Sequence, residues 1–407
     1  MKIRRLLFFS LLKPLLTVFD FIIPKDKSLF VFGYKSTLYA DNSRYFFEYI
    51  RENNLGVNAV WMTLNKDLHI NLQRKYGKKS CALINSLSGL WIFLRARVAI
   101  YSHGSYDLGR LISHYSPKLI VNLSHGQTFK ADTGYGGIYY RSRKQRRIKI
   151  EDRVDLFAVS SQLEAYSIKF CFGRNLKRPI VSGFPRNDIL LLNLKKQIED
   201  EILILKQRLK INFIPKHVIL YAPTWRKDGT AKLFPLKDLN FQQFNKLMIE
   251  HDGLLLIRGH RNDFSESSDL LKQADKNIRN KEWIRFIHQS EFPDIQEILH
   301  MVTLLITDYS SIFFDFLLVN RPIFFITPDF EEYNEEIGFL YPYDLMAPGP
   351  KINTDDDFLA HLKAFLEGTD SYADQRSWVS TLLFEQNQPI ARKIILEEIK
   401  SNINWKI

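Results

Sequence analysis

Two short polar stretches contain histidines placed for acid–base or phosphate chemistry, and the first is SHGQTFK. His125 comes one residue after the apolar run 119–123 and precedes Gly126, and Lys130 supplies a cation a few residues later. An imidazole can act as a general base at neutral pH, and glycine lets the backbone turn sharply and leaves room for a ligand. The stretch predicts a catalytic base at His125; the alternative is a histidine that only satisfies a turn.

The second stretch is IRGHR, in which Arg258, His260 and Arg261 stand together after another apolar run. Three cationic or cation-capable groups beyond a buried strand are typical of a phosphate site, because guanidinium groups bind phosphate oxygens in pairs. A solvated basic loop is the alternative interpretation of this stretch.

The stretch TDYSS ends one apolar run just before the next begins. If residues 304–306 form a strand and residues 312–319 a helix, Ser310 and Ser311 lie at the helix start. Their hydroxyls can cap the helix, or the exposed N–H groups and the helix dipole can bind an anion. Asp308 together with two serines is more than capping requires, so we interpret this turn as a phosphate site.

A weaker candidate is the polar and aromatic loop YAPTWRKDG, which follows a further apolar run. Thr224, Trp225 and Arg226 would lie in this loop, where they could contact a nucleoside base or a ribose. The loop alone predicts no particular ligand.

The elements that position these stretches are apolar runs of strand length with amphipathic segments between them. The predicted strands are 29–32, 57–62, 98–101, 119–123, 156–159, 179–181, 218–221, 254–257, 302–306 and 323–326. Helical patterns include 42–53 and 162–172, and a long charged helix is expected at 188–210. Such alternation predicts parallel sheets covered on both faces. Ligands of open α/β sheets bind beyond the carboxyl ends of the strands, where the polar stretches lie.

The charge and the cysteines limit the partners and the compartment. Lys and Arg number 57 and Asp and Glu 45, which gives a net charge of +12. Such an excess favours an anionic partner: nucleic acid, a phosphorylated substrate or an anionic membrane surface. Cys81 and Cys171 lack metal-ligand spacing, so the sequence predicts neither a disulfide framework nor a zinc site, and a reducing cytosolic location is the default.

Residues 1–24 have a basic start and many large apolar side chains. Lys13 interrupts the apolar region too early for a signal peptide, and Lys13 with Asp20 breaks the ~20-residue apolar stretch that a spanning helix needs. At helical spacing the polar residues share one side, opposite Val18 and Ile22. The pattern predicts a helix that lies in a membrane interface; an ordinary packed helix is the alternative.

Two charged runs allow a functional and an ordinary interpretation. Residues 141–149 contain six cationic side chains in nine positions. They form either a solvated helix face or a contact to anionic lipid. The acidic run at 355–357 is expected to cap a helix rather than to bind a metal. Because no paired-carboxylate motif is evident in the loops, we expect no essential metal and no other cofactor.

Together, SHGQTFK, YAPTWR, RGHR and TDYSSIFFDF resemble, in order and spacing, the CDP-glycerol glycerophosphotransferase family of teichoic acid synthesis. FGYKSTLYADNSRYFFEYI (32–50) and APGP (347–350) fit as well, and the resemblance covers residues 28–370. TDYSS with the following FDF is its most specific part. The resemblance implies an α/β fold of the GT-B type, with two Rossmann-like domains facing a central cleft.

The resemblance also implies a reaction: glycerol phosphate moves from CDP-glycerol to a hydroxyl of a membrane-linked acceptor, and CMP leaves. His125 matches the family's base histidine, and His260 its second essential histidine, near the donor phosphates. Ser310 and Ser311 would hold the diphosphate. The substrate-binding candidates are Lys130, Thr224, Arg226, Arg258, Arg261, Asp308, Ser310 and Ser311.

The expected domains follow from a break in the pattern near residue 210 and from the resemblance. The predicted boundaries give a membrane-associating segment (1–27), an acceptor-side Rossmann-like domain (28–210), a nucleotide-donor Rossmann-like domain (211–370) and C-terminal helices (371–407). Membrane attachment at the cytoplasmic face is usual in the family. The length leans toward a short, primase-like enzyme.

Departures from the family's pattern leave the substrates open. Ser124 stands where the family usually has Trp, and Arg261 where it often has Pro. CDP-ribitol is therefore an alternative donor, and a capsule polymer an alternative product.

Two other classes of protein also match parts of the sequence. One is a GT-B glycosyltransferase that uses a nucleotide-sugar. The other is a non-catalytic protein that binds anionic lipid or nucleic acid, but no aromatic and basic RNA-binding motif supports it. We expect CDP-glycerol or CDP-ribitol, a lipid-linked acceptor and an anionic membrane surface as partners, and no nucleic acid.

Overall fold

The computed structural model describes the following residues: 15–109, 111–112, 115–130, 153–172, 176–192, 195–224, 240–258, 282–287, 292–385 and 389–405. Their contacts divide them between two compact units. The first unit takes its described residues from the ranges 1–127, 133–188 and 384–407, and the second from 128–132 and 189–383.

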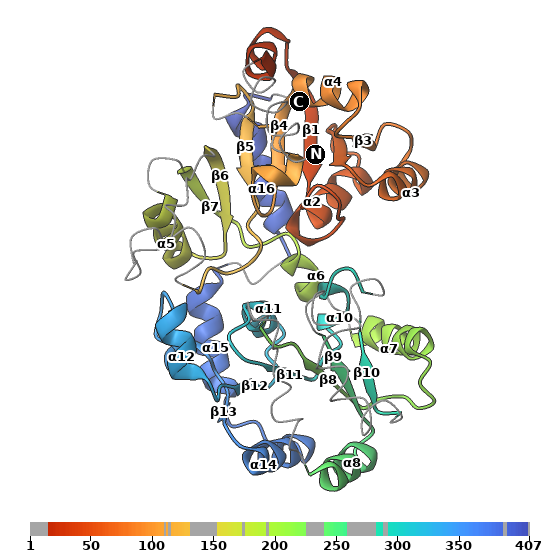
Figure 1. The fold of residues 1–407 in the computed structure, drawn as a ribbon, viewed down its shortest axis with the longest axis vertical. Helices are drawn as coiled ribbons and strands as arrows, with labels where there is room; N and C mark the ends of the chain where they lie inside the picture. The colour runs from red at the N-terminus through yellow and green to blue at the C-terminus, as the bar shows by residue number, and fades with distance from the viewer. Residues whose placement is uncertain are drawn as a thin grey trace, which may run out of the picture. The chain divides into compact units, whose positions relative to one another are not determined.

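The first unit is built on a seven-stranded parallel sheet (Figure 1). Its strands are β1 (Asp26–Gly33), β2 (Asn58–Thr63), β3 (Cys81–Leu83), β4 (Ala96–Tyr101), β5 (Leu119–Asn122), β6 (Val154–Val159) and β7 (Leu176–Val181). The strand order is β3-β2-β1-β4-β5-β6-β7. The chain therefore reverses its direction across the sheet between β1 and β4, which is the switch point where such sheets bind ligands.

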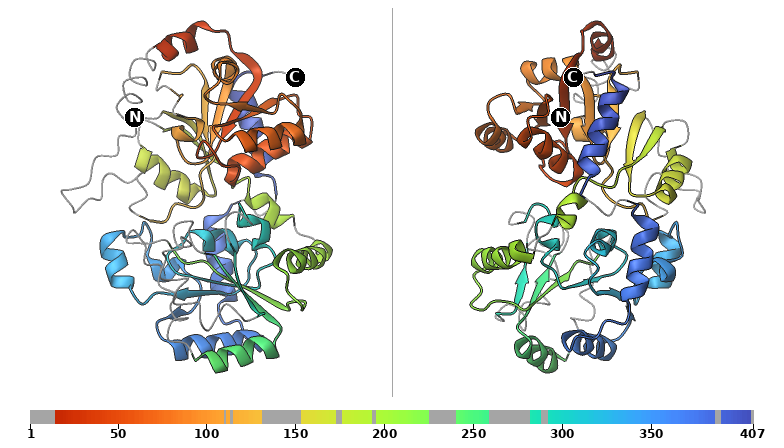
Figure 2. Two further views of the ribbon diagram at one scale, coloured as in Figure 1. Left: turned by 45° about the vertical axis from the view of Figure 1, so that its right-hand side comes forward. Right: turned by 180° about the vertical axis from the view of Figure 1, so that it is seen from behind.

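Helices cover both faces of this sheet. They are α2 (Asp41–Glu52), α3 (Lys66–Tyr76), α4 (Leu87–Arg95), η1 (Ser105–Leu108), α5 (Gln162–Phe172) and α16 (Ala391–Asn402). The short helix α6 (Asn187–Leu191) lies where the chain leaves the first unit. Alternate residues of β1 enter different cores, as the two-residue period of a strand requires. Phe30 and Phe32 share a cluster with residues of α2 and of α16, which Figure 2 shows against the sheet. Val31 shares the other cluster with Phe93 of α4.

The second unit has a six-stranded parallel sheet in the order β10-β9-β8-β11-β12-β13. Its strands are β8 (His217–Tyr221), β9 (Gly253–Ile257), β10 (Ile284–Phe286), β11 (Leu304–Thr307), β12 (Ile323–Ile326) and β13 (Lys351–Ile352). The switch point here lies between β8 and β11, so the loops after these two strands are where a ligand site is expected.

The described helices of the second unit are long at its beginning and its end and short between α10 and α13. They are α7 (Lys195–Leu209), α8 (Phe241–Glu250), α10 (Gln296–Leu299), α11 (Ile312–Leu317), α12 (Phe330–Glu336), α13 (Tyr343–Met346), α14 (Asp355–Leu366) and α15 (Ala373–Leu383). Residues of α8 and α14 form one core with β8, β9, β11 and β12. The acidic run 355–357 lies in the first turn of α14, and the Thr354 side chain accepts a hydrogen bond from the Asp357 N–H.

The predicted alternation of strands and helices in two parallel sheets is confirmed, and every predicted strand corresponds to a strand of the structure. The sequence analysis missed three edge or near-edge strands, namely β3, β10 and β13, which have three, three and two residues. Runs this short carry no periodicity that separates them from loops.

The chain passes between the two units after Asp188, upstream of the boundary expected near residue 210. Two helices, α6 and α7, occupy the range expected to hold one long helix. Arg208 of α7 forms an ion pair with Glu297, which ties this helix to the second unit. Residues 384–407 belong to the first unit, because α16 contributes Ile395 and Ile399 to the core of the first sheet.

The helix at residues 15–22 is joined to the first unit through a buried carboxylate. Asp20 is 3% exposed and accepts hydrogen bonds from Ser116 at 2.6 Å and Lys25 at 2.9 Å, and from Lys118. The polar side that includes Asp20 therefore meets protein, whereas Val18 and Ile22 are 53% and 69% exposed. Among the described residues, the structure has no helix with the length and hydropathy to cross a membrane.

Candidate active site

The switch point of the first sheet is organised by one buried carboxylate, that of Asp107 in η1. Its Oδ1 accepts a hydrogen bond from the Lys35 N–H at 2.8 Å, and its Oδ2 accepts from the N–H groups of Ser102 at 3.2 Å and His103 at 2.8 Å. Burial raises the pKa of Asp107 to about 6, while the backbone donors oppose this rise. The carboxylate thus fixes the loops that follow β1 and β4 relative to one another.

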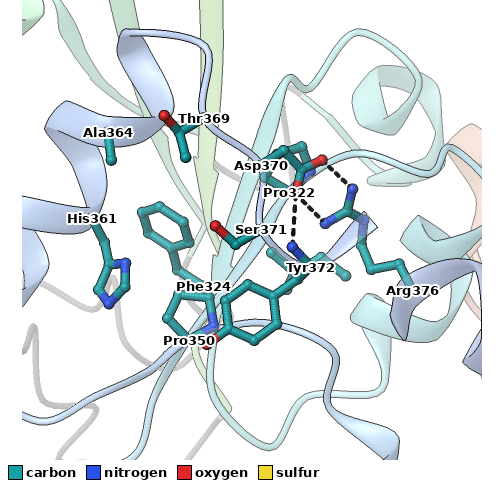
Figure 3. Close-up of a pocket in the computed structure, with 11 residues that line it drawn as sticks. Pro322, Phe324, Pro350, His361, Ala364, Thr369, Asp370, Ser371, Tyr372 and Arg376 are labelled. Atoms are coloured by element: carbon teal, nitrogen blue, oxygen red, sulfur yellow. Dashed lines mark hydrogen bonds and ion pairs between the residues drawn. The ribbon is translucent and has the colours of Figure 1, made fainter. Parts of the chain in front are cut away.

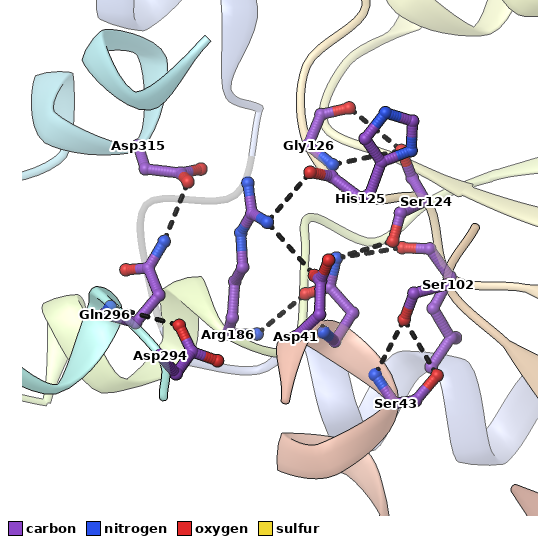
Figure 4. Close-up of polar contacts among 12 residues, drawn as sticks. Asp41, Ser43, Ser102, Ser124, His125, Gly126, Arg186, Asp294, Gln296 and Asp315 are labelled. Atoms are coloured by element: carbon purple, nitrogen blue, oxygen red, sulfur yellow. Dashed lines mark hydrogen bonds and ion pairs between the residues drawn. The ribbon is translucent and has the colours of Figure 1, made fainter. Parts of the chain in front are cut away.

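The start of α2 is tied to the loops after β4 and β5. Asn42 donates from Nδ2 to the carbonyl oxygens of Leu123 at 3.1 Å and Ser124 at 2.9 Å. The Ser43 N–H donates to the Ser102 hydroxyl at 2.9 Å, and the two serine hydroxyls lie 2.8 Å apart. These contacts, drawn in Figure 4, hold the residue that precedes His125.

Arg186, in the segment after β7, completes this polar network (Figure 4). Its Nη1 lies 2.8 Å from the His125 carbonyl oxygen and 3.0 Å from Asp41 Oδ1, with which it forms an ion pair. Gly126 has a φ of +126°, and a Cβ at this position would collide with the Arg186 guanidinium. A side chain at Gly126 would therefore displace either the arginine or the backbone of the predicted base.

The His125 ring lies in a stack with a second histidine that the sequence analysis did not select. The ring centroids of His125 and His103 are 4.4 Å apart, with 7° between their planes. The His125 Nδ1 atom is buried and has no hydrogen-bond partner among the described residues. Burial, together with the charges of His103, Arg186 and Lys35, lowers the pKa of His125 to about 3. His125 is therefore a neutral imidazole at pH 7 with an unused nitrogen.

In the second unit, the switch point joins the loops after β8 and β11 through Asp308. Its Oδ1 accepts hydrogen bonds from the Thr224 N–H at 2.8 Å and the Thr224 hydroxyl at 2.6 Å. The Tyr343 hydroxyl donates to the Asp308 carbonyl oxygen at 3.0 Å. Two predicted site residues, Asp308 and Thr224, are thus in direct contact.

The predicted turn before α11 is present, and Ser311 is the residue that precedes its first turn. No side chain makes a capping hydrogen bond there. Ser310 and Ser311 are both half-buried. Capping, the ordinary interpretation of the two hydroxyls, is therefore not what the structure shows.

Two other predicted residues, Arg258 and Lys130, make contacts within the second unit. Arg258 donates to the Phe292 carbonyl oxygen at 2.7 Å, and burial lowers its pKa. Lys130 lies with its ammonium 5.5 Å from the ring centroid of Tyr333 and belongs to the second unit, whereas His125 belongs to the first. Gln296 donates to Asp315 at 2.7 Å in a buried contact (Figure 4).

Several predictions fall outside the described residues. These are His260, Arg226 and Arg261, the basic run 141–149 and the first 14 residues.

The residues that the sequence analysis missed in the first unit are Asp107, Arg186 and His103. One signal was available: Ser-His-Gly occurs twice, at 102–104 and at 124–126, each time after an apolar run.

A small cavity of about 70 Å³ lies elsewhere in the second unit, beside Pro322 and Pro350, which precede β12 and β13 (Figure 3). Its polar lining includes the buried Arg376, which pairs with Asp370 at 2.8 Å through Nη1. The cavity is thus at the amino ends of the strands, opposite the edge where the site candidates lie, and its guanidinium is already paired. The described residues contain no group of side chains that could hold a metal ion.

Two parallel sheets with polar groups at their switch points define an α/β protein with two Rossmann-like units. The sequence model of CDP-glycerol:poly(glycerophosphate) glycerophosphotransferases matches residues 15–401, and the chain belongs to this family.

The relatives agree with this assignment. A teichoic acid poly(glycerol phosphate) polymerase of Bacillus spizizenii is 31% identical over 82% of this chain and 82% of its own length. A polymerase of the same description from Bacillus subtilis is 30% identical over 83% of this chain, but only 44% of its own length is covered. A ribitol-phosphate polymerase of Staphylococcus aureus, TarL, is 27% identical over 54% of the chain.

A solved structure of the wall teichoic acid polymerase TagF has the same fold, with a TM-score of 0.75 at 21% identity over 99% of this chain and 97% of that one. The predicted family and enzyme class are confirmed, as is glycerophosphate transfer from CDP-glycerol in teichoic acid synthesis.

Proposed function

We propose that the first unit binds the acceptor, that the second binds CDP-glycerol, and that His125 is the general base. The acceptor hydroxyl loses its proton to the His125 imidazole and its oxygen bonds to the β-phosphorus. The bond between this phosphorus and the oxygen bridging to the α-phosphate breaks, and CMP leaves with that oxygen. The observation that carries the proposal is the neutral ring of His125, with its buried and unused Nδ1, at the switch point of the first sheet.

The electrostatics around His125 decide its protonation before the reaction. A base must be neutral at that point, and burial, with the charges of His103, Arg186 and Lys35, keeps the ring neutral at pH 7. The same surroundings disfavour the imidazolium, so they make His125 a weaker proton acceptor than a free imidazole. An unpartnered buried nitrogen is unfavourable, and an acceptor hydroxyl that donates to it would relieve this penalty. Proton transfer to such a base typically accelerates a reaction by ~10²–10⁴-fold.

The donor side rests on Asp308, Thr224 and the two serines before α11. Asp308 holds the loop after β8 against the loop after β11, and this brings Thr224 to the switch point. Ser310 and Ser311 make no capping contact, which leaves their hydroxyls for the diphosphate. His260, Arg226, Arg258 and Arg261 remain further donor-site candidates from the sequence.

We also propose that the protein attaches to an anionic membrane surface, at the cytoplasmic face, where the acceptor is anchored. The helix at 15–22 presents Val18, Phe21 and Ile22 to the outside, with exposures of 53%, 58% and 69%. Its carboxylate is turned inward. A helix whose apolar side is exposed and whose polar side is bound to protein is suited to an interface between lipid and water. The positive net charge of +12 favours anionic lipid.

The test of the donor is a panel of CDP-glycerol, CDP-ribitol and UDP-sugars, each assayed for nucleotide release with an alkyl-anchored glycerol phosphate dimer as acceptor. We expect CMP release from CDP-glycerol. CDP-ribitol is the second candidate donor because TarL is among the relatives. Faster turnover of CDP-ribitol would replace the donor in this proposal, and release of UDP alone would contradict it.

A further inference from the structure

The two Ser-His-Gly triplets leave the sheet at neighbouring positions. Residues 102–104 follow β4 and residues 124–126 follow β5. These strands pair in parallel, with Tyr101 opposite Asn122. Because parallel strands end at the same edge, the two histidines emerge side by side at that edge. Only one of them, His125, has a role in the proposed function.

His103 is held on both its backbone and its side chain. Its N–H donates to Asp107 at 2.8 Å, and its Nδ1 lies 2.5 Å from the Tyr106 hydroxyl oxygen. Its ring plane is within 7° of that of His125 at a centroid distance of 4.4 Å. The N–H bonds of an imidazole lie in the plane of its ring, so neither of two parallel stacked rings can donate to the other. The contact between the two histidines is therefore stacking and not a hydrogen bond.

We propose that His103 is a positioning residue for the base: its ring fixes the plane of the His125 ring and must be neutral for His125 to accept a proton. This inference rests on the proposed role of His125. It adds a second histidine, His103, to the acceptor side of the reaction and requires that this histidine be neutral.

The reason is the charge that develops on His125. When His125 takes the proton, its ring becomes a cation, and a neutral aromatic ring stacked on it is an attractive neighbour. A second imidazolium at 4.4 Å would instead repel that charge.

The other groups around His103 and His125 do not compensate two positive charges on these rings. Lys35 and Arg186 are already positive, and Asp41 opposes them only in part. The carboxylate of Asp107 accepts from backbone N–H groups, and because burial raises its pKa to about 6, it too takes up a proton near that pH. Tyr106 contributes a neutral hydroxyl. Burial and Lys35 also lower the pKa of His103, which keeps it neutral at pH 7.

The experiment compares His103→Ala and His103→Phe with the wild type. The rate of CMP release from CDP-glycerol is measured with the alkyl-anchored glycerol phosphate dimer between about pH 5 and pH 9. Phenylalanine keeps a flat ring that cannot be protonated, whereas alanine removes the ring. The matched control is His69→Phe. His69 lies in α3 and is not part of the network formed by Asp107, His103 and His125.

We expect His103→Ala to lower kcat by up to about 100-fold, because a misplaced reacting group costs about this much. The KM for CDP-glycerol should stay the same. His103→Phe should retain kcat within a few-fold of wild type near neutral pH. It should also stay active at a lower pH than the wild type, because the residue that takes the first proton is gone. Histidine ring NMR should show His103 protonating before His125 in the wild type.

Different results overturn different parts of this account. If both His103 variants follow the wild-type rate and pH curve while His125→Ala is inactive, the inference is wrong and the base assignment stands. If His125→Ala retains turnover, the proposed function fails, and the inference fails with it. If His103→Ala does not fold, the pH–rate profile of His103→Phe is the test. A loss of activity at low pH that matches that of the wild type would contradict the inference.

Discussion

At the residue scale, His125 is distinguished by its surroundings. Its carbonyl oxygen is bound by Arg186, its ring is stacked on His103, and its Nδ1 has no hydrogen-bond partner in the described part of the chain. The first two contacts fix where the ring lies, and the third leaves it free to take a proton. These features make its chemistry testable by single substitutions.

The first prediction is that His125→Ala lowers the rate of CMP release in the presence of acceptor by ~10²–10⁴-fold. The affinity for CDP-glycerol, measured by calorimetry, should be nearly unchanged, since the variant removes a base and not a donor contact. A variant that keeps most of its turnover would remove the base assignment.

The second prediction concerns pH. Burial and the neighbouring charges lower the pKa of His125 to about 3, and the pKa of His103 is lowered too. The neutral, active form should therefore persist below the ordinary histidine pKa. With an ordinary pKa of about 6.5, only about a tenth of the base would remain neutral at about pH 5.5. We expect turnover at that pH to exceed a tenth of its plateau, in a pH–rate profile with saturating CDP-glycerol. A midpoint at or above the ordinary histidine pKa would contradict this.

The third prediction compares two glycines that have positive φ. Gly126→Ala adds a Cβ against the Arg186 guanidinium, whereas Gly77→Ala, at φ +92°, meets nothing within 4 Å. Both should lose stability by about 1–3 kcal/mol from backbone strain, measured by denaturant unfolding. Only Gly126→Ala should also lose turnover. Equal activity in the two variants would show that the contact between Arg186 and Gly126 does not matter for the base.

His125 could be selected from the sequence because a histidine beside a glycine after an apolar run is a local pattern. Arg186 and Asp107 could not, because their roles depend on contacts with residues far along the chain, such as Asp41 and Lys35. His103 had the same local pattern as His125 and was overlooked. Its role becomes visible only when the pairing of β4 and β5 is known.

At the scale of elements, parallel sheets were predictable because most of the longer strands contain a continuous buried apolar run. The helix expected at 188–210 was only partly right, since α6 and α7 occupy that range. The boundary between the units follows from which core each helix joins, and this is a property of tertiary packing that charge patterns do not carry. The same holds for α16, which returns to the first sheet.

The fourth prediction belongs to α11. Ser310 and Ser311 make no capping contact, so replacing both by valine should leave the helix intact. CDP-glycerol binding should weaken by about 1.5–3 kcal/mol for each hydrogen bond to a charged phosphate that is lost. Calorimetry on the double variant measures this, and Ser377→Val, on the exposed surface of α15, is the control. Unaltered affinity in a folded double variant would show that the turn is only structural.

At the scale of the whole molecule, a positive net charge and an exposed apolar helix face point to the same partner. The charge is a property of the sequence as a whole, whereas the orientation of the helix at 15–22 needed the structure. Asp20 is turned inward because Lys118, whose side chain is 0% exposed, would otherwise be a buried and unpaired cation. Deleting the helix would therefore damage the first unit as well as any attachment, so substitutions on the outer face give the cleaner test.

The last prediction is that Val18→Ser combined with Ile22→Ser moves the protein from the membrane pellet to the supernatant. These side chains are exposed, so the free energy of unfolding and the affinity for CDP-glycerol should stay close to wild type. A helix that binds lipid through buried apolar area gains about 25 cal/mol for each Å² removed from water, and serine removes most of that area at both positions. The measurement is co-sedimentation with vesicles that contain anionic lipid at moderate salt, and with neutral vesicles for comparison. The control is Ile249→Ser, which removes an equally exposed side chain, 60% accessible, from α8 in the second unit. If the double variant and the control sediment alike, the exposed face of this helix is not the membrane contact, and attachment would have to lie elsewhere in the chain.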